Sequence, residues 1–166
     1  LTNSSSTSTT DITSSNYTSY GAVTASSYVS SYSWTTLSGR AVIQMKGTAS
    51  YTAVLSFKAN TAGTYTIYYA YSTESRYDKL TIIANGTTYV DAVSGENTSL
   101  QTISNISLSS GDMITVSYQK DGSVDSGSDC VWVGFSVTTS SAESSSLSTI
   151  SDADIPASAF SLCNLL

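Results

Sequence analysis

The stretch KLTIIANGTTYVDAV, Lys79 to Val93, decides the fold. Two runs with apolar residues at alternating positions, KLTIIA and TTYVDAV, flank the dipeptide Asn85-Gly86. Asn-Gly accepts positive φ at both central positions, as a type I′ turn requires, and that turn joins the strands of a tight hairpin. The stretch therefore predicts two adjacent antiparallel strands.

Four further segments repeat this two-residue alternation, which is typical of strands with one face buried. They are residues 51–57, 64–71, 112–118 and 131–137. The side chains expected to face inward are Tyr51, Ala53, Leu55, Phe57, Tyr65, Ile67, Tyr69, Tyr71, Ile114, Val116, Tyr118, Val131, Val133, Phe135 and Val137. About eight short strands without helical periodicity predict an all-β protein, an antiparallel, jelly-roll-like β-sandwich with extended N- and C-terminal segments.

Composition divides the chain into three predicted regions. Residues 1–33 form a Ser/Thr-rich N-terminal extension, 34–139 the β-sandwich domain, and 140–166 a C-terminal tail. The extension is expected to be disordered at its start unless something holds it, because ordering each residue costs roughly 1–2 kcal/mol of backbone entropy. Its later part could supply one or two edge strands, with Val23, Tyr28 and Tyr32 as candidate buried positions.

The charge balance excludes several classes of partner. Only 11% of the residues are charged and the net charge is −6. Six basic residues form no patch for nucleic acid, which needs clustered Lys and Arg. No apolar run approaches the roughly 20 residues that a membrane span needs, so no membrane insertion is expected. The Ser/Thr-rich surface favours an extracellular or cell-surface protein whose signal peptide has already been removed.

Five asparagines lie in N-x-Ser/Thr sequons and are glycosylation candidates. They are Asn3, Asn16, Asn85, Asn97 and Asn105.

The residue inventory argues against an enzyme. Histidine is absent, which excludes Ser-His-Asp and Cys-His arrangements and zinc sites built on histidine. No Gly-rich phosphate loop is present, and the spacing of the carboxylates selects no catalytic pair. We therefore expect a protein without catalytic activity and, calcium aside, without a cofactor.

The segment KDGSVDSGSDCVW, Lys120 to Trp132, carries Asp121, Asp125 and Asp129 at four-residue intervals. Calcium takes six to eight oxygen ligands in permissive geometry, so the three carboxylates are candidate calcium ligands. The alternative is a polar loop that only reverses the chain. The two cysteines, Cys130 and Cys163, would form a disulfide in an oxidising compartment, and the alternative is two buried, unpaired thiols.

Aromatic side chains off the inward faces are candidates for carbohydrate binding, because sugar rings stack on exposed Tyr and Trp. The candidates are Tyr68, Tyr77, Tyr89 and Trp132.

Two signatures, Tyr77–Leu80 and Lys120–Trp132, resemble a module of secreted microbial surface and adhesin proteins. The resemblance implies a jelly-roll sandwich of the galactose-binding-like type, to which carbohydrate binding or adhesion is mostly ascribed. It extends to Asp78, Lys79, Asp121 and Asp129. Such modules usually have an acidic residue where this chain has Gly134, two places after the tryptophan.

Two functions follow as expectations. The first is a structural subunit of an extracellular filament, sheath or matrix, a homopolymer assembled by exchange of terminal strands, because long hydroxyl-rich ends flank a small sandwich. The alternative is a carbohydrate-binding or adhesion module with glycans as partners.

Overall fold

The computed structural model describes residues 5–123 and 128–142. The elements in chain order are β1 (Ser5–Ile12), α1 (Tyr17–Tyr20), β2 (Gly21–Ala25), β3 (Val29–Leu37), β4 (Arg40–Gly47), β5 (Thr52–Ala59), β6 (Gly63–Ser72), β7 (Lys79–Ala84), β8 (Thr87–Val93), β9 (Glu96–Leu108), β10 (Met113–Gln119) and β11 (Cys130–Ala142).

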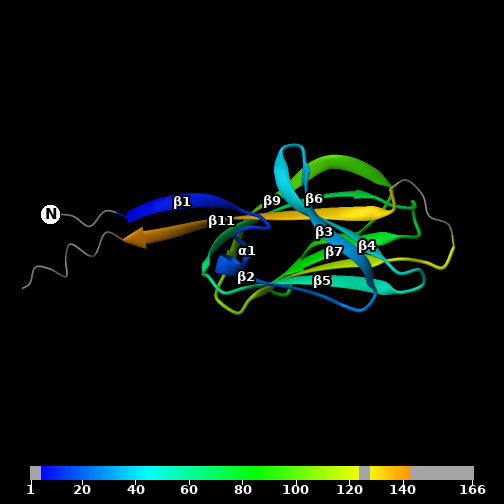
Figure 1. The fold of residues 1–166 in the computed structure, drawn as a ribbon, viewed down its shortest axis with the longest axis horizontal. Helices are drawn as coiled ribbons and strands as arrows, with labels where there is room; N and C mark the ends of the chain where they lie inside the picture. Colours follow the sequence, from blue (N-terminus) through cyan, green and yellow to red (C-terminus); the bar gives the residue numbers. More distant parts are fainter. Residues whose placement is uncertain (1–4, 124–127, 143–166) are drawn as a thin grey trace, which may run out of the picture. The chain divides into compact units, whose positions relative to one another are not determined.

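The strands form two antiparallel sheets (Figure 1). The first sheet has the order β3-β4-β11-β6-β9, with β1 paired to β11, and the second has the order β2-β5-β10-β7-β8. The prediction of an all-β, antiparallel, jelly-roll-like sandwich is confirmed. Within the described residues, no helix is long and apolar enough to cross a membrane.

The chain divides into two compact units. The larger, Thr9–Thr138, is the sandwich. The smaller combines Leu1–Ser8 with Thr139–Leu166, and its described residues, 5–8 and 139–142, belong to β1 and β11. Strands β1 and β2 and the start of β3 come from residues 1–33, where we expected an extension.

The hairpin that decided the fold is present as β7 and β8. Asn85 and Gly86 have φ of 46° and 82°, the positive values that the type I′ turn requires. Leu80, Ile82 and Ala84 are buried on one face of β7, as the alternation predicts.

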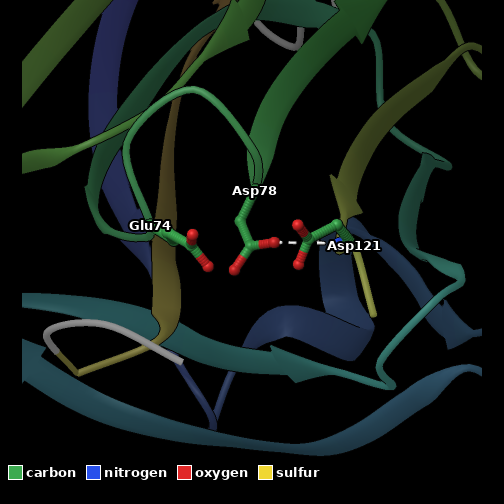
Figure 2. A group of neighbouring side chains, drawn as sticks. All are labelled: Glu74, Asp78 and Asp121. Atoms are coloured by element: carbon green, nitrogen blue, oxygen red, sulfur yellow. Dashed lines mark hydrogen bonds between the residues drawn. The ribbon is translucent and has the colours of Figure 1, made fainter. Parts of the chain in front are cut away.

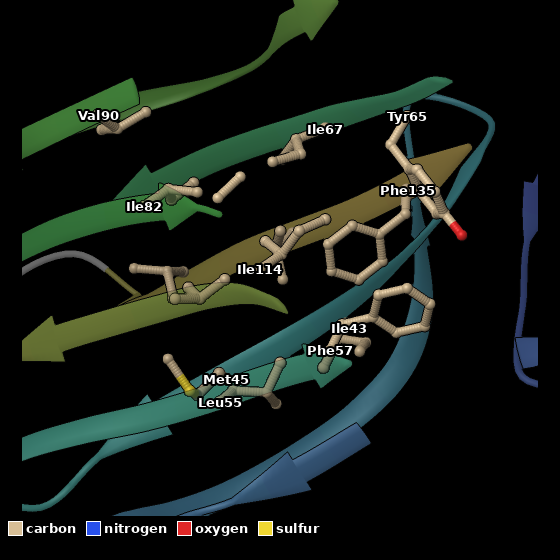
Figure 3. Close-up of a cluster of buried hydrophobic side chains, with 14 of the residues drawn as sticks. Ile43, Met45, Leu55, Phe57, Tyr65, Ile67, Ile82, Val90, Ile114 and Phe135 are labelled. Carbon is tan, nitrogen blue, oxygen red and sulfur yellow. The ribbon is translucent and has the colours of Figure 1, made fainter. Parts of the chain in front are cut away.

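The core lies between the inner faces of the sheets (Figure 3). Most of the side chains expected to face inward are fully buried in it, and Tyr69 and Tyr71 are half-buried against it. Phe57 of the second sheet stacks on Phe135 of the first, with ring centroids 5.0 Å apart. Because interiors are close-packed, this interdigitation of the two faces holds the sheets together.

Three tyrosines are exposed where we expected burial. Tyr51 is 49% exposed because it precedes the first residue of β5 and lies in a loop. Tyr28, 42% exposed, lies before β3 in the same way. Tyr32, 43% exposed, is on β3, an edge strand of the first sheet, after a register shift between Val29 and Ser31.

Gly134 is required by a close approach of two backbones. Its neighbours Val133 and Phe135 face the core, so a side chain at Gly134 would point to the outer side of the first sheet. An added Cβ would lie 2.5 Å from the carbonyl oxygen of Ala41, on β4. The acidic residue that the resembling modules carry at this position therefore has no room here.

Candidate functional site at the loop end

Five connections between strands lie at the same end of the sandwich, because the antiparallel register places their strand ends side by side. We call them together the loop end. It comprises residues 26–28, 48–51, 73–78, 94–95 and 120–129, of which 124–127 are outside the described part of the chain.

A lysine lies buried at the centre of the loop end. The Nζ of Lys120 donates to Oδ2 of Asp78 at 3.2 Å and to Oδ1 of Asp129 at 2.6 Å. The side chains of Lys120 and Asp78 are 4% and 0% exposed. Charges so far from water persist only when they are paired and hydrogen-bonded, so these partners explain why a lysine is tolerated here.

Two further groups complete this network. The hydroxyl of Tyr118 donates to Oδ1 of Asp129 at 2.6 Å, and the backbone N–H of Asp121 donates to Oδ1 of Asp78 at 2.9 Å. Burial, together with the hydrogen bond to Asp129, raises the pKa of Tyr118 well above its ordinary value. Tyr118 therefore remains a neutral donor at physiological pH.

Three carboxylates gather beside this network. Oxygens of Glu74, Asp78 and Asp121 lie within 4.8 Å of one another (Figure 2). Such oxygens could hold a metal ion, and hard cations such as calcium prefer them as ligands.

The set differs from the calcium ligands expected from spacing. Asp121 belongs to it, Asp129 is bonded to Lys120 and Tyr118 instead, and Asp125 lies outside the described residues. The sequence pattern did not predict Glu74 and Asp78 as calcium ligands, because both lie far from Asp121 in sequence and no local spacing links them to it. The resemblance pointed to Asp78, but only as part of a signature.

Two exposed tyrosines lie on the loop end. The rings of Tyr28 and Tyr51 stack with centroids 4.2 Å apart and an interplanar angle of 4°. They are 42% and 49% exposed, so the pair presents aromatic surface to solvent. We call it the tyrosine pair. Sequence reasoning missed it, because alternation alone placed both rings in the core.

Backbone hydrogen bonds fix the tyrosine pair to the buried network. The N–H and the hydroxyl of Thr48 both donate to the carbonyl of Tyr28 at 2.9 Å. The N–H of Tyr51 donates to the carbonyl of Thr48 at 3.2 Å, and the carbonyl of Tyr51 accepts from Lys120 N–H at 3.0 Å. The N–H of Ser50 donates to the carbonyl of Asp121 at 2.9 Å. The rings thus stand on loops that the Lys120 network orders.

The backbone of the loop end is strained at three residues. Ser50, Arg76 and Asp129 have φ of 72°, 79° and 50°, in the left-handed region that costs residues with a side chain roughly 1–2 kcal/mol. Such strain tends to gather at functional sites, where surrounding bonds hold it in place. Here the N–H of Arg76 donates to Oγ of Ser94 at 2.8 Å.

The four aromatic residues expected to bind sugar are not brought together. Tyr77 is on the loop end and is 53% exposed. Tyr68 and Trp132 are half-buried on the outer face of the first sheet, where the guanidinium of Arg40 lies 3.9 Å from the Tyr68 ring centroid. Tyr89 is on β8, an edge strand of the second sheet, and is 41% exposed.

The predicted disulfide is not tested, because Cys163 lies outside the described residues. Cys130 is fully buried, and its Sγ accepts a hydrogen bond from Nε2 of Gln44 at 3.4 Å. Burial raises the pKa of the Cys130 thiol, so it remains protonated at neutral pH. Among the sequons, Asn85 and Asn105 are exposed, Asn16 and Asn97 are half-buried, and Asn3 lies outside the described part.

Comparison with known proteins gives structural matches only. No family model and no curated protein matches the chain. Solved structures similar to it include a mutant of a carbohydrate binding module of family 29, at 11% identity and a TM-score of 0.44 over 81% of this chain and 93% of that one. A family 35 module from Paenibacillus barcinonensis matches at 19% identity and a TM-score of 0.37, over 76% of this chain and 97% of that one. A family 36 module in complex with calcium and xylotriose matches at 13% identity and a TM-score of 0.36, over 80% of this chain and 99% of that one.

The expectation of a filament subunit is wrong by this comparison. The similar solved structures just described are carbohydrate-binding modules, and a homopolymer finds no support. Hydroxyl-rich termini by themselves do not specify assembly, because Ser and Thr equally suit a solvated segment.

Proposed function

We propose that the protein is a non-catalytic, extracellular carbohydrate-binding module that holds a glycan chain on the tyrosine pair of the loop end. The observation that carries the proposal is the pair itself, two parallel rings 4.2 Å apart with more than two fifths of each exposed.

The tyrosine pair suits a sugar because its position is fixed before binding. The apolar face of a pyranose stacks on aromatic rings, and a preordered surface avoids the entropy cost of ordering side chains on association. Hydrogen bonds through Thr48, Ser50 and Lys120 supply this order.

Polar groups beside the rings supply hydrogen-bond partners for sugar hydroxyls. Ser50 precedes Tyr51 directly and is bonded to the backbone of Asp121. The Asp121 carboxylate accepts from the N–H and hydroxyl of Ser123 at 3.0 and 3.1 Å, which shapes the start of the 120–129 loop. Tyr77, in the 73–78 loop, is a further exposed aromatic residue of the loop end.

The test is affinity electrophoresis in gels containing soluble xylan, β-glucan or galactan, followed by calorimetry with oligosaccharides of the polymer that retards the protein. We expect Tyr28→Ala and Tyr51→Ala each to weaken binding at least tenfold, which corresponds to about 1.4 kcal/mol. Tyr28→Phe and Tyr51→Phe should retain most of the affinity, because stacking needs the ring rather than the hydroxyl.

Tyr89→Ala is the matched control. Tyr89 is 41% exposed, close to the value for Tyr28, but it lies on β8 away from the loop end. Its replacement should leave binding unchanged. If Tyr89→Ala abolishes retardation while Tyr28→Ala and Tyr51→Ala do not, the proposed site is wrong.

We further propose that calcium binds beside this surface, at Glu74, Asp78 and Asp121. Oxygens of these three carboxylates lie within 4.8 Å of one another, so their negative charges repel. A divalent cation would reduce this repulsion and hold together the 73–78 and 120–129 loops that carry the three carboxylates.

A further inference from the structure

A cavity of about 200 Å³ opens between the segment that follows β1 and the hairpin of β3 and β4. We call it the Trp34 pocket. Its lining residues are Thr13, Ser14, Trp34, Thr35, Thr36 and Ala41. None of them carries a charge, and four of the six carry a hydroxyl group.

Trp34 forms the aromatic wall of the pocket, and contacts with the core and with Tyr17 hold it in position. Trp34 is half-buried and packs against the core, and its ring lies against that of Tyr17 with centroids 5.6 Å apart. Trp34 is also in register with the core residue Ile43. With these contacts its indole cannot leave the wall without losing core packing, so its orientation is fixed in the absence of a ligand.

The segment that carries Thr13 and Ser14 forms the polar wall of the pocket, and its own hydrogen bonds order it without a ligand. The N–H of Thr13 donates to Oδ1 of Asn16 at 2.7 Å, and Nδ2 of Asn16 donates to the carbonyl of Asp11 at 3.0 Å. Asp11 accepts from Nη1 of Arg40 at 2.7 Å, which ties this segment to β4 beside Ala41. Both sides of the pocket are thus linked by an ion pair.

Hydroxyl groups without a protein partner lie at the pocket. Thr36 is on the same side of β3 as Trp34, because side chains alternate along a strand, whereas the Thr35 side chain points to the other side. Ser14 and Thr36 are exposed, and in the described part of the chain their hydroxyls make no hydrogen bond to protein groups. They are available to a ligand that both donates and accepts hydrogen bonds.

We propose that the Trp34 pocket binds one neutral pyranose, the terminal residue of a glycan, stacked on the indole of Trp34. A volume of 200 Å³ corresponds to roughly six or seven waters, at about 30 Å³ each, which is the size of a single sugar ring and too small for an oligosaccharide. An uncharged lining of hydroxyls with one aromatic ring matches a ligand that has hydroxyls at its edge and an apolar face.

This site is separate from the tyrosine pair. Tyr28 precedes β3, whereas Trp34, Thr35 and Thr36 lie near its far end, about 20 Å away at 3.2–3.4 Å per residue. The two proposals therefore fail or succeed independently.

The test uses tryptophan fluorescence of the full chain carrying Trp132→Phe, which leaves Trp34 as the sole indole because the sequence has two tryptophans. Glucose, galactose, mannose and xylose are titrated one at a time, with glucuronate as the charged comparison. We expect a saturable change in Trp34 emission with at least one neutral sugar and a weaker response to glucuronate. The Kd should be on the order of millimolar, as befits a ligand of about a dozen heavy atoms.

Ala41→Leu, made in the same background, fills the pocket and leaves Trp34 in place. It should abolish the response while the near-ultraviolet circular dichroism and the melting temperature show a folded protein. Tyr28→Ala should leave the response intact even if it abolishes polysaccharide binding. A response that persists in Ala41→Leu, or that no neutral sugar produces, overturns the proposal.

Discussion

Lys120 and Asp78 are 42 residues apart in sequence, yet the Lys120 ammonium donates to the Asp78 carboxylate at 3.2 Å with both side chains almost completely buried. This pair joins the connection between β6 and β7 to the one between β10 and β11. It anchors the loop end, on which both the tyrosine pair and the acidic group depend.

Removing the lysine should destabilise the fold strongly. In Lys120→Met, Asp78 keeps its burial and loses its counter-charge, and breaking a buried pair in this way typically costs about 3–5 kcal/mol. Asp78→Asn should cost less, since Lys120 still has Asp129. Urea denaturation of the two single variants and the double variant measures the coupling. Strictly additive free energies would show that the pair does not act as a unit.

Alkaline pH should weaken the protein through its buried tyrosines. Burial raises the pKa of Tyr65 from 10.0 to about 12 and also raises that of Tyr118. The folded state thus holds protons that the unfolded state releases above pH 10, so stability is complete below pH 10 and falls as pH rises.

Tyr65 should contribute a loss of about 1.4 kcal/mol per pH unit between pH 10 and about pH 12, and Tyr118 should contribute a loss in the same direction. Urea denaturation at successive pH values measures the slope. Tyr118→Phe should reduce the slope of the unfolding free energy against pH, because this variant lacks the ionisation of one buried tyrosine. An unchanged slope in that variant would show that Tyr118 ionises equally in both states.

A methyl group at Gly134 should disturb the contact between β4 and β11. Gly134→Ala places a carbon 2.5 Å from the Ala41 carbonyl oxygen, and overpacking of this kind costs about 1–3 kcal/mol. Gly47→Ala is the control, because its added carbon meets nothing closer than 3.3 Å. Thermal melting of both variants should show a large loss only for Gly134→Ala, and equal losses would contradict the close approach of the β4 and β11 backbones.

Calcium should raise the melting temperature if Glu74, Asp78 and Asp121 bind it. At a concentration 100 times the Kd the gain is about 2.7 kcal/mol, or about 5–10 °C for a domain of this size. Asp121→Asn should reduce the shift. Asp129→Asn should lower the starting stability, because it weakens the bond to Lys120, but it should keep the shift, because Asp129 is outside the group of three carboxylates. No shift at millimolar calcium would exclude the ion.

Local pattern predicted much of the fold. Side chains alternate across a strand every two residues, so the buried faces of β5, β6, β10 and β11 could be derived from sequence, as could the Asn85-Gly86 turn. The pattern failed at Tyr28, Tyr32 and Tyr51, because the alternation continues past the strand end at two of them and along an edge strand at the third.

The sequence by itself determined the sandwich class and most of the core, since both depend on periodicities within a few residues. Only the tertiary structure decided that Glu74 meets Asp121, that Lys120 lies between Asp78 and Asp129, and that Tyr28 stacks on Tyr51. These contacts depend on strand order and register, which arise from packing the two sheets as a whole and leave no local mark on the chain. The aspartates of KDGSVDSGSDCVW therefore looked like one set in sequence, and Asp121 and Asp129 take different partners in the fold.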